Sequence, residues 1–284
     1  MKLEVEKAAG IGFCFGVKQT IDTLKKVAHE RGKVEVLGAI VHNHEVEQEL
    51  ADSGVTVVGS LEDMKGDIVA IGAHGVTPQI EAEMRARHSV VINTTCPFVH
   101  RVQIAARKLA GAGFLVIIYG DVEHAEVKGI LGWSDGKGVA TLDDNFATTL
   151  GQLPRWVGVL SQTTQIPDRF TGFVKKIIDV ALVKDAELRI IDTICHDTKK
   201  RQQAALELAK RVDLMLVIGS NTSANTRHLA ELCATVSPTY QVGTAQEIKP
   251  AWFKGYHRVG VTGGASTAEG TINEVLASLE TLST

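Results

Sequence analysis

The chain of 284 residues contains no long hydrophobic run. Its longest apolar segments, residues 114–119 and 214–218, are far shorter than the roughly 20 residues that a helix needs to cross a bilayer. Residues 1–6 alternate apolar and charged side chains, as a first strand does, and lack the apolar core of a signal peptide. We therefore expect no membrane partner and a cytoplasmic location.

The sequence also lacks an excess of charge of either sign. The formal net charge is −3, and no run of Lys and Arg is long enough to bind a nucleic-acid backbone. Hydrophobic residues make up 44% of the chain, which is enough to form a core. We expect an ordinary globular protein that does not bind nucleic acid.

Two nucleotide-binding motifs are missing. The glycines of residues 10–16 are spaced unlike the dinucleotide fingerprint, and a cysteine interrupts them. Residues 219–225 do not end in Gly-Lys-Ser or Gly-Lys-Thr, so they are not a P-loop. Nicotinamide and nucleoside triphosphates are therefore not expected ligands.

Cysteine is scarce, with four residues, and a disulfide framework is not expected in a reducing compartment. Three of the cysteines open a repeated template. After each of them a glycine and two polar residues follow at the same offsets. The cysteines are Cys14, Cys96 and Cys195, the glycines Gly38, Gly120 and Gly219, and the polar residues His42 and His44, His124 and Glu126, and Ser223 and Asn225.

Each repeat has two arms. In the first arm, the cysteine opens a stretch with helical apolar spacing, and a short apolar run then ends at the shared glycine, which predicts a helix followed by a strand. In the second arm an apolar strand stops at a polar residue, namely His74, Thr163 or Ser266. Pro78, Pro167 and Gly270 follow in loop or first-turn positions. In parallel α/β sheets such strand ends face the ligand crevice.

The repeats predict an α/β fold of three similar units with small parallel sheets. The expected units are residues 14–95, 96–194 and 195–284, with residues 1–13 as a leading strand that joins the third unit. A pseudo-threefold (trefoil) arrangement would bring the equivalent loops, with their cysteines, histidines and hydroxyls, together in one central cavity.

The cysteines are candidate metal ligands, because a helix N-terminus favours the thiolate and three thiolates at one point need a metal. A structural zinc site usually has four ligands with close Cys-x-x-Cys pairs, which this sequence lacks. A [4Fe–4S] cluster accepts distant ligands, and with three cysteines one iron stays open. The alternative is that Cys14, Cys96 and Cys195 are small core residues. Cys233 lies on an apolar helix face, and for it we expect that structural role.

The polar template residues are suited to bind an anionic phosphate group. Taken singly, each could instead be a helix cap or a surface residue. We expect His44 to be structural. The candidate phosphate ligands are His42, His74, His124, Thr163, Ser223, Asn225 and Ser266.

Glu126 is the one carboxylate at its template offset. Beside a cluster and a phosphate, a carboxyl group with a raised pKa can hold and deliver a proton. The alternative is an ordinary surface glutamate after a turn. The sequence thus makes Glu126 a candidate general acid.

In these motifs the chain resembles the LytB-type family of 4-hydroxy-3-methylbut-2-enyl diphosphate reductases, which act in the non-mevalonate isoprenoid pathway. The resemblance covers essentially the whole chain. The motifs that carry it are GFCFGV (12–17), VHN (41–43), AHGV (73–76), TCP (95–97), HAEV (124–127), QTT (162–164), DTIC (192–195), SAN (223–225) and TGGAS (262–266).

The resemblance implies an oxygen-sensitive [4Fe–4S] enzyme whose apical iron binds the substrate's hydroxyl group. Two electrons and two protons would remove that group as water and give isopentenyl and dimethylallyl diphosphates. Thr163 and Glu126 would form the proton relay, with His124 near the diphosphate. Ferredoxin or flavodoxin would supply the electrons. The diphosphate ligands implied by similarity are His42, His74, Ser223, Asn225 and Ser266.

Two residues depart from the family pattern. Ala125 stands where the family usually has Pro, and Ala224 where it usually has Ser. Loss of one neutral hydrogen bond there weakens binding by about 1 kcal/mol, which does not abolish function. Two alternatives remain: a paralogous iron–sulfur reductase for another allylic or phosphorylated substrate, and a non-enzymatic zinc-stabilised or iron-sensing protein.

Overall fold

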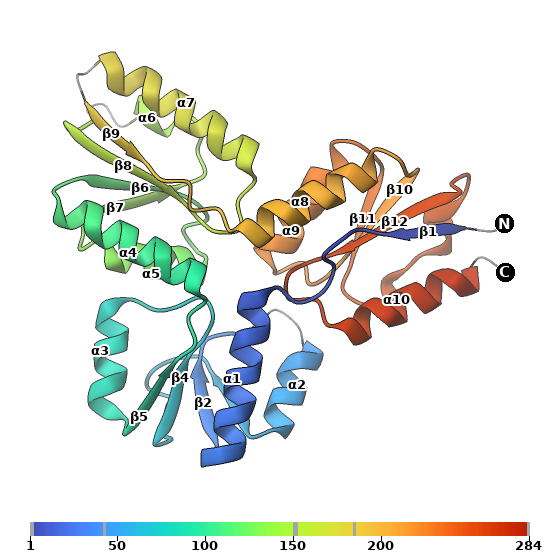
Figure 1. Cartoon of the computed structure of the whole chain (residues 1–284), viewed down its shortest axis with the longest axis horizontal. Coiled ribbons are helices and arrows are strands. Elements are labelled where there is room, and N and C mark those ends of the chain that lie inside the picture. The colour runs from blue at the N-terminus through green and yellow to red at the C-terminus, as the bar shows by residue number, and fades with distance from the viewer. Residues whose placement is uncertain (1–2, 42–43, 150–152, 184–185, 283–284) are drawn as a thin grey trace. The chain divides into compact units, whose positions relative to one another are not determined.

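The computed structural model describes residues 3–41, 44–149, 153–183 and 186–282 (Figure 1). The strands are β1 (Glu4–Lys7), β2 (Val34–Leu37), β3 (Val55–Val58), β4 (Ile68–Ile71), β5 (Val90–Asn93), β6 (Leu115–Tyr119), β7 (Gly138–Thr141), β8 (Trp156–Ser161), β9 (Glu187–Ile190), β10 (Leu214–Ile218), β11 (Thr239–Val242) and β12 (Arg258–Gly263). The helices are α1 (Phe15–Arg31), α2 (His44–Asp52), α3 (Pro78–Arg87), α4 (Pro97–Gly111), α5 (Ala125–Trp133), α6 (Phe146–Thr149), α7 (Pro167–Val183), α8 (His196–Ala209), α9 (Ala224–Ala234) and α10 (Glu269–Leu282), with 3₁₀ helices η1 (Ala245–Glu247) and η2 (Pro250–Phe253).

These strands form three parallel sheets of four strands each. The sheets have one strand order, namely β3-β2-β4-β5, β7-β6-β8-β9 and β11-β10-β12-β1. In the third sheet β1 pairs with β12 and takes the place that β5 and β9 have in the others. The prediction of an α/β fold with three small parallel sheets is therefore confirmed, and the trefoil arrangement stays a prediction.

The backbone around the shared glycines repeats as well. In each sheet the glycine amide donates a hydrogen bond to the last carbonyl of the outer strand. The bonds are Gly38 to Val58 (2.9 Å), Gly120 to Thr141 (3.0 Å) and Gly219 to Val242 (2.8 Å). Gly219 has a φ of +140°, and an added Cβ would come 2.8 Å from Thr226 Oγ1. A side chain there would be strained and would crowd the start of α9.

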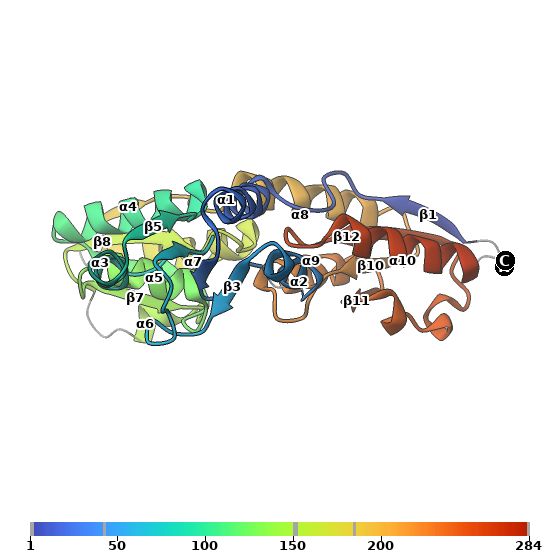
Figure 2. The same cartoon turned by 90° about the horizontal axis from the view of Figure 1, so that it is seen from below.

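Helices cover both faces of the sheets, because successive strand residues point to opposite sides. In β10, Leu214, Leu216 and Ile218 pack in one core with α10. Met215 and Val217 pack in a second core with α8 and α9. Figure 2 shows α10 lying along this sheet. The strand is buried on both faces, and this explains its continuous apolar run.

The chain divides into two compact units, although its described strands form three sheets. The terminal unit comprises Met1–Lys18, Val41–Glu49 and His196–Thr284, and the middle unit comprises Gln19–Ile40 and Leu50–Cys195. Helix α3 packs against α5 within the middle unit, so its two sheets share one body. The three-unit boundaries expected from the sequence stay a prediction.

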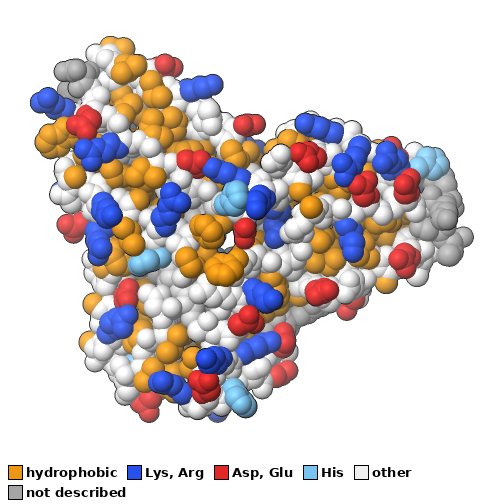
Figure 3. Space-filling view, viewed as in Figure 1, with side chains coloured by type: hydrophobic (Ala, Val, Ile, Leu, Met, Phe, Trp, Pro, Cys, Tyr) orange, Lys and Arg blue, Asp and Glu red, His pale blue; other side chains and the backbone are white. Residues whose placement is uncertain are grey.

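No helix in the described part of the chain is long and apolar enough to cross a membrane. On the face drawn in Figure 3, Lys and Arg side chains are interspersed with Asp and Glu side chains. This mixture fits the small net charge of the sequence.

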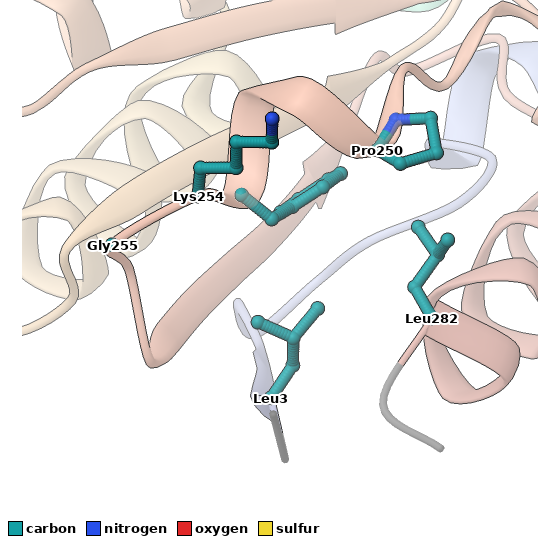
Figure 4. A pocket seen from close by; sticks show the side chains of 6 residues that line it. Leu3, Pro250, Lys254, Gly255 and Leu282 are labelled. Atoms are coloured by element: carbon teal, nitrogen blue, oxygen red, sulfur yellow. The ribbon is translucent and has the colours of Figure 1, made fainter.

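A small apolar hollow of about 320 Å³ lies in the terminal unit at the N-terminal ends of its strands (Figure 4). Leu3 and Leu282 line it from the two ends of the chain, and Pro250 and Phe253 line it from η2. Ligand crevices of parallel sheets lie at the opposite, C-terminal ends of the strands. This hollow therefore lies at the opposite ends of the strands from the candidate site residues.

Candidate functional site

The three template cysteines each stand directly before a helix. Helices α1, α4 and α8 begin at the residue after Cys14, Cys96 and Cys195, respectively. The amide of Val17 donates to Cys14 Sγ (3.5 Å), so this sulfur accepts a hydrogen bond from the first turn of α1. All three cysteines are half-buried and form no disulfide. The three thiols therefore share one local environment, directly before the first turn of a helix.

A second repeated contact ties each cysteine to the loop after a second-arm strand. The backbone amide of the cysteine donates to a carbonyl of that loop in all three repeats. The bonds are Cys14 to Ala265 (3.0 Å), Cys96 to Ala73 (3.0 Å) and Cys195 to Thr163 (2.9 Å). Each acceptor is, or directly precedes, a candidate site residue. Each sheet thus places the thiol that follows its edge strand beside the polar residue that follows the neighbouring strand.

The cysteines do not all belong to one unit. Cys96 and Cys195 lie in the middle unit and Cys14 in the terminal unit. Within the described residues, no three His, Cys, Asp or Glu side chains form a group that could hold a metal ion. The thiols at helix N-termini have the chemistry that an iron–sulfur cluster needs, and their joint ligation stays a prediction.

Cys233 has the expected structural place. It is fully buried in the core of α8, α9 and β10. Burial raises the pKa of its thiol to about 12, so the thiolate is disfavoured. The prediction that Cys233 is a core residue is confirmed.

The carboxyl group of Glu126 is bound by Thr163. Glu126 is the second residue of α5, and Thr163 follows the end of β8. The Thr163 amide donates to Oε1 (2.7 Å), and the Thr163 hydroxyl donates to Oε2 (2.8 Å). Glu126 is only 2% exposed, and this burial raises its pKa to about 6, against the lowering effect of the two hydrogen bonds. A carboxyl group with this pKa can hold a proton near neutral pH.

Two candidate histidines adjoin this pair. His124 is the N-cap of α5, and its Nδ1 accepts a hydrogen bond from the Glu126 amide (3.2 Å). The rings of His74 and His124 are 5.3 Å apart and meet edge to face. The middle unit therefore brings His74, His124, Glu126 and Thr163 into one group at the C-terminal ends of its strands.

A cavity of about 460 Å³ adjoins this group within the middle unit. The loops after β2, β3 and β4 line it on one side, and Ala125 and Lys128 of α5 line it on the other. His74 is part of its wall. Lys128 pairs with Glu123 at 2.8 Å, so its charge is partly compensated.

The remaining candidates form a second group in the terminal unit. Ser223 is the N-cap of α9, and its hydroxyl accepts from the Thr226 amide (3.4 Å). Asn225 is 7% exposed, and its Nδ2 has no partner among the described residues. Ser266 follows β12 and is half-buried. An unpaired amide donor at a helix N-terminus is suited to an anionic ligand.

The candidate His42 lies outside the described residues. His44 is the first residue of α2, and its side chain is not described. The role expected for His42 in binding phosphate therefore stays a prediction.

The residues that depart from the family pattern occupy the first positions of two capped helices. Ala125 begins α5 after the cap His124, and Ala224 begins α9 after the cap Ser223. Both caps make their hydrogen bond. Because Thr163 binds both carboxylate oxygens of Glu126, this side chain is fixed without proline at position 125.

Two buried polar residues that support the site were not among the predicted site residues. Gln162, which is fully buried, accepts a hydrogen bond from the Asp121 amide (3.1 Å) and so connects the end of β8 to the loop before α5. Arg201 on α8 is 6% exposed and donates to the carbonyls of Gly12 (2.8 Å) and Gly263 (2.9 Å). From the sequence, a polar residue within a helix is expected at the surface. Only the fold shows that Arg201 is buried and binds these two carbonyls.

Arg201→Met is expected to lower the free energy of unfolding by about 3 kcal/mol, because two buried carbonyls lose a charged donor. Arg211→Met is the control, since Arg211 only pairs with Glu6 at the surface, a pair typically worth less than about 1 kcal/mol. Urea unfolding of both variants measures the difference. Equal destabilisation of the two variants would contradict a supporting role for Arg201 beside Cys14.

Comparison with known proteins gives one family. The family model described as LytB protein matches residues 5–280. Curated 4-hydroxy-3-methylbut-2-enyl diphosphate reductases are similar over the full length. That of Dehalococcoides mccartyi (strain CBDB1) is 56% identical over 99% of both chains, and that of Geobacter metallireducens is 40% identical over 96% of both chains.

Solved structures agree with this result. A structure of (E)-4-hydroxy-3-methyl-but-2-enyl diphosphate reductase, the terminal enzyme of the non-mevalonate pathway, covers 98% of this chain and 99% of its own, with a TM-score of 0.69 and 35% identity. The E-1-hydroxy-2-methyl-but-2-enyl-4-diphosphate reductase from Plasmodium falciparum, at 24% identity, shares the fold with a TM-score of 0.88 and covers 98% of this chain and 88% of its own. The matches in sequence and in structure both extend over nearly the whole chain, and the chain belongs to the LytB family.

Proposed function

We propose that this protein reduces 4-hydroxy-3-methylbut-2-enyl diphosphate to isopentenyl and dimethylallyl diphosphates, as the last step of the non-mevalonate pathway. The observation that carries the proposal is the buried pair of Glu126 and Thr163 beside His74 and His124, in a chain that is similar over its full length to such reductases. A cytoplasmic location is part of the same proposal.

The reaction needs protons in a closed site. Removal of the hydroxyl group consumes two electrons and two protons, because one proton leaves with the hydroxyl as water and the other forms the new C–H bond. A [4Fe–4S] cluster bound by Cys14, Cys96 and Cys195 would relay the two electrons from an external donor such as ferredoxin or flavodoxin and would supply an open coordination position. Glu126 holds the proton for the leaving hydroxyl, and the hydroxyl of Thr163 passes it, since the two side chains share a 2.8 Å hydrogen bond.

The diphosphate would be bound by neutral donors. Because Nδ1 of His124 accepts from the Glu126 amide, its Nε2 carries the proton in the neutral ring and can donate to a phosphate oxygen. The unpaired Nδ2 of Asn225 and the hydroxyl of Ser266 are donors of the same kind. His42, His74 and Ser223 complete the proposed set, while both donors of Thr163 are bound to Glu126.

A metal-binding scaffold without catalysis is the weaker alternative. Such a protein has no use for a carboxyl group that is buried at a cost and held by two hydrogen bonds. A paralogous reductase for another allylic substrate would keep this acid pair, so only the substrate assay separates it.

The test is anaerobic purification followed by turnover with the allylic diphosphate and reduced methyl viologen. We expect brown protein with four iron and four sulfide per chain, and both five-carbon diphosphates as products. Colourless protein that contains zinc would overturn the proposal. Brown protein that turns over only other substrates would assign the paralogous function.

His74→Ala is expected to weaken substrate binding by about 1.5–3 kcal/mol, because a donor to a charged phosphate group is lost. The absorption spectrum of the cluster should not change. His29→Ala is the control, since His29 is an exposed residue of α1. Titration of the substrate-induced spectral change measures both affinities, and normal affinity of the His74 variant would remove this residue from the phosphate site.

A further inference from the structure

A hollow of about 370 Å³ in the middle unit lies between α4 and the chain that continues from β9. Its floor is apolar and consists of Ile104, Ala105, Leu109 and Ile191. Three cationic side chains line it as well, namely Arg101, Lys108 and Arg189. We call this feature the cationic groove. In Figure 3 several Lys and Arg side chains lie beside hydrophobic ones over the region of α4 and β9.

One wall of the cationic groove is a single face of α4. Arg101, Ile104, Ala105 and Lys108 follow the helical spacing of one face. Arg101 and Lys108 are exposed, about 10 Å apart along the axis, and neither forms an ion pair with any residue that the structure describes. The helix therefore presents two uncompensated positive charges at the two ends of an apolar strip.

The other wall holds its cation in a fixed position. The guanidinium group of Arg189 lies 4.3 Å from the ring centre of Phe114. It also donates two hydrogen bonds to Glu187 Oε1, at 3.0 and 3.1 Å. Glu187 therefore compensates the charge of Arg189. The excess positive charge of the groove comes from Arg101 and Lys108 of α4.

Both walls lead to predicted cluster ligands within the same unit. Arg101 lies five residues after Cys96, which is about 8 Å along α4. Ile191 lies four residues before Cys195. A partner bound in the groove would thus contact α4, which begins directly after Cys96, and the segment that leads from β9 to Cys195.

We propose that the cationic groove is the docking surface of an acidic electron-transfer protein. This inference rests on the proposed function, which needs an external electron donor. Positive charges around an apolar floor complement an acidic rim around an apolar contact, and they steer such a partner to the surface. Redox partners form small, short-lived interfaces, so such a partner does not need an extended apolar surface.

The test compares two electron sources for the double variant Arg101→Glu/Lys108→Glu. With a reduced acidic bacterial ferredoxin at low salt, kcat/KM for ferredoxin is expected to fall about tenfold or more. With reduced methyl viologen, which needs no docking surface, turnover should stay at the wild-type level. The wild-type rate with ferredoxin should also fall as salt rises, and the variant should lose most of this dependence.

Lys175→Glu is the matched control. Lys175 is an exposed residue of α7, which packs in the core on the other face of the same sheet. This variant should keep the wild-type rate with both electron sources. Dye-driven turnover of the wild type is measured before any variant is tested. Its absence would refute the proposed function itself.

Three results would overturn the docking proposal while the function stands. The first is an unchanged ferredoxin rate in the double variant. The second is an equal loss of the ferredoxin-driven and dye-driven rates. The third is a wild-type dimer in sedimentation that the double variant abolishes, which would assign the groove to a second copy of the chain.

Discussion

Glu126→Gln is expected to lower turnover by about 10²–10⁴-fold and to leave the cluster and substrate binding intact. The amide keeps the size of the side chain and can still accept from the Thr163 amide, and its NH₂ group can donate to the Thr163 hydroxyl. This pattern resembles that of the protonated acid, so the local structure should persist. The variant cannot deliver an acid proton, and hydroxide is a poor leaving group.

The measurement is anaerobic turnover beside the cluster spectrum and the spectral change on substrate addition. Glu123→Gln is the matched control, because Glu123 lies in the same loop but is exposed and pairs only with Lys128. A Glu126 variant with a full cluster, normal binding and near-wild-type turnover would shift the proton source to His124 or to the substrate's own diphosphate.

The pH dependence of the same variant gives an independent check. The folded-state pKa of Glu126 is raised from 4.5 to about 6 by burial, so the acid form is favoured in the folded protein. The stability that this preference contributes, about 2 kcal/mol, is fully present below pH 4.5 and is lost as pH rises through about 6. The Gln variant should lack this loss. In the wild type, kcat/KM should fall above about pH 6, and this fall should be absent from the variant's residual activity.

Cys96→Ser is expected to remove the cluster or degrade it, and turnover should fall to background with it. Serine keeps the shape of the side chain but is a poor ligand for iron, which in these clusters is bound by thiolates. The same result is expected for Cys14→Ser and Cys195→Ser, because all three thiols occupy one template position before a helix. Iron and sulfide analysis of anaerobically purified protein measures the effect.

Cys233→Ala is the control for the cysteine series. Its thiol lies in an apolar core with a pKa raised to about 12 and is not available as a thiolate ligand. The variant should keep four iron per chain, as one [4Fe–4S] cluster requires. If it lost iron as fully as the Cys96 variant, or if a template variant kept a full cluster, the ligand assignment would be wrong.

Much of the fold could be predicted from local patterns. The apolar runs expected to form strands before Gly38, Gly120 and Gly219 appear as β2, β6 and β10, each ending at the residue before the glycine, because central strands of parallel sheets are continuous apolar runs. The helices expected after the three cysteines begin at the next residue in each case. The outer strands β3, β5, β7, β9 and β11 were not expected, because their half-exposed side chains carry little pattern and pairing with a neighbour decides them.

The candidate site could be predicted in part. The repeat identified Glu126 and Thr163, and their hydrogen bonds show that the two loops meet. Arg201 was not among the predicted site residues, because its partners Gly12 and Gly263 are far from it in sequence and offer only backbone carbonyls. Gln162 stood in a quoted motif without a role for the same reason.

The sequence by itself determined which residues are candidates for the chemistry, because the repeat places thiols, histidines and hydroxyls at equivalent positions of strand and helix ends. It also determined the class of fold, since alternating helices and apolar runs of this length form parallel sheets. Only the tertiary structure decided the protonation of Glu126, because its pKa depends on burial and on two hydrogen bonds from Thr163. It also decided the position and register of β1 within that sheet, where this leading strand pairs in parallel with β12. Burial and pairing are properties of the folded chain, and a linear pattern cannot specify them.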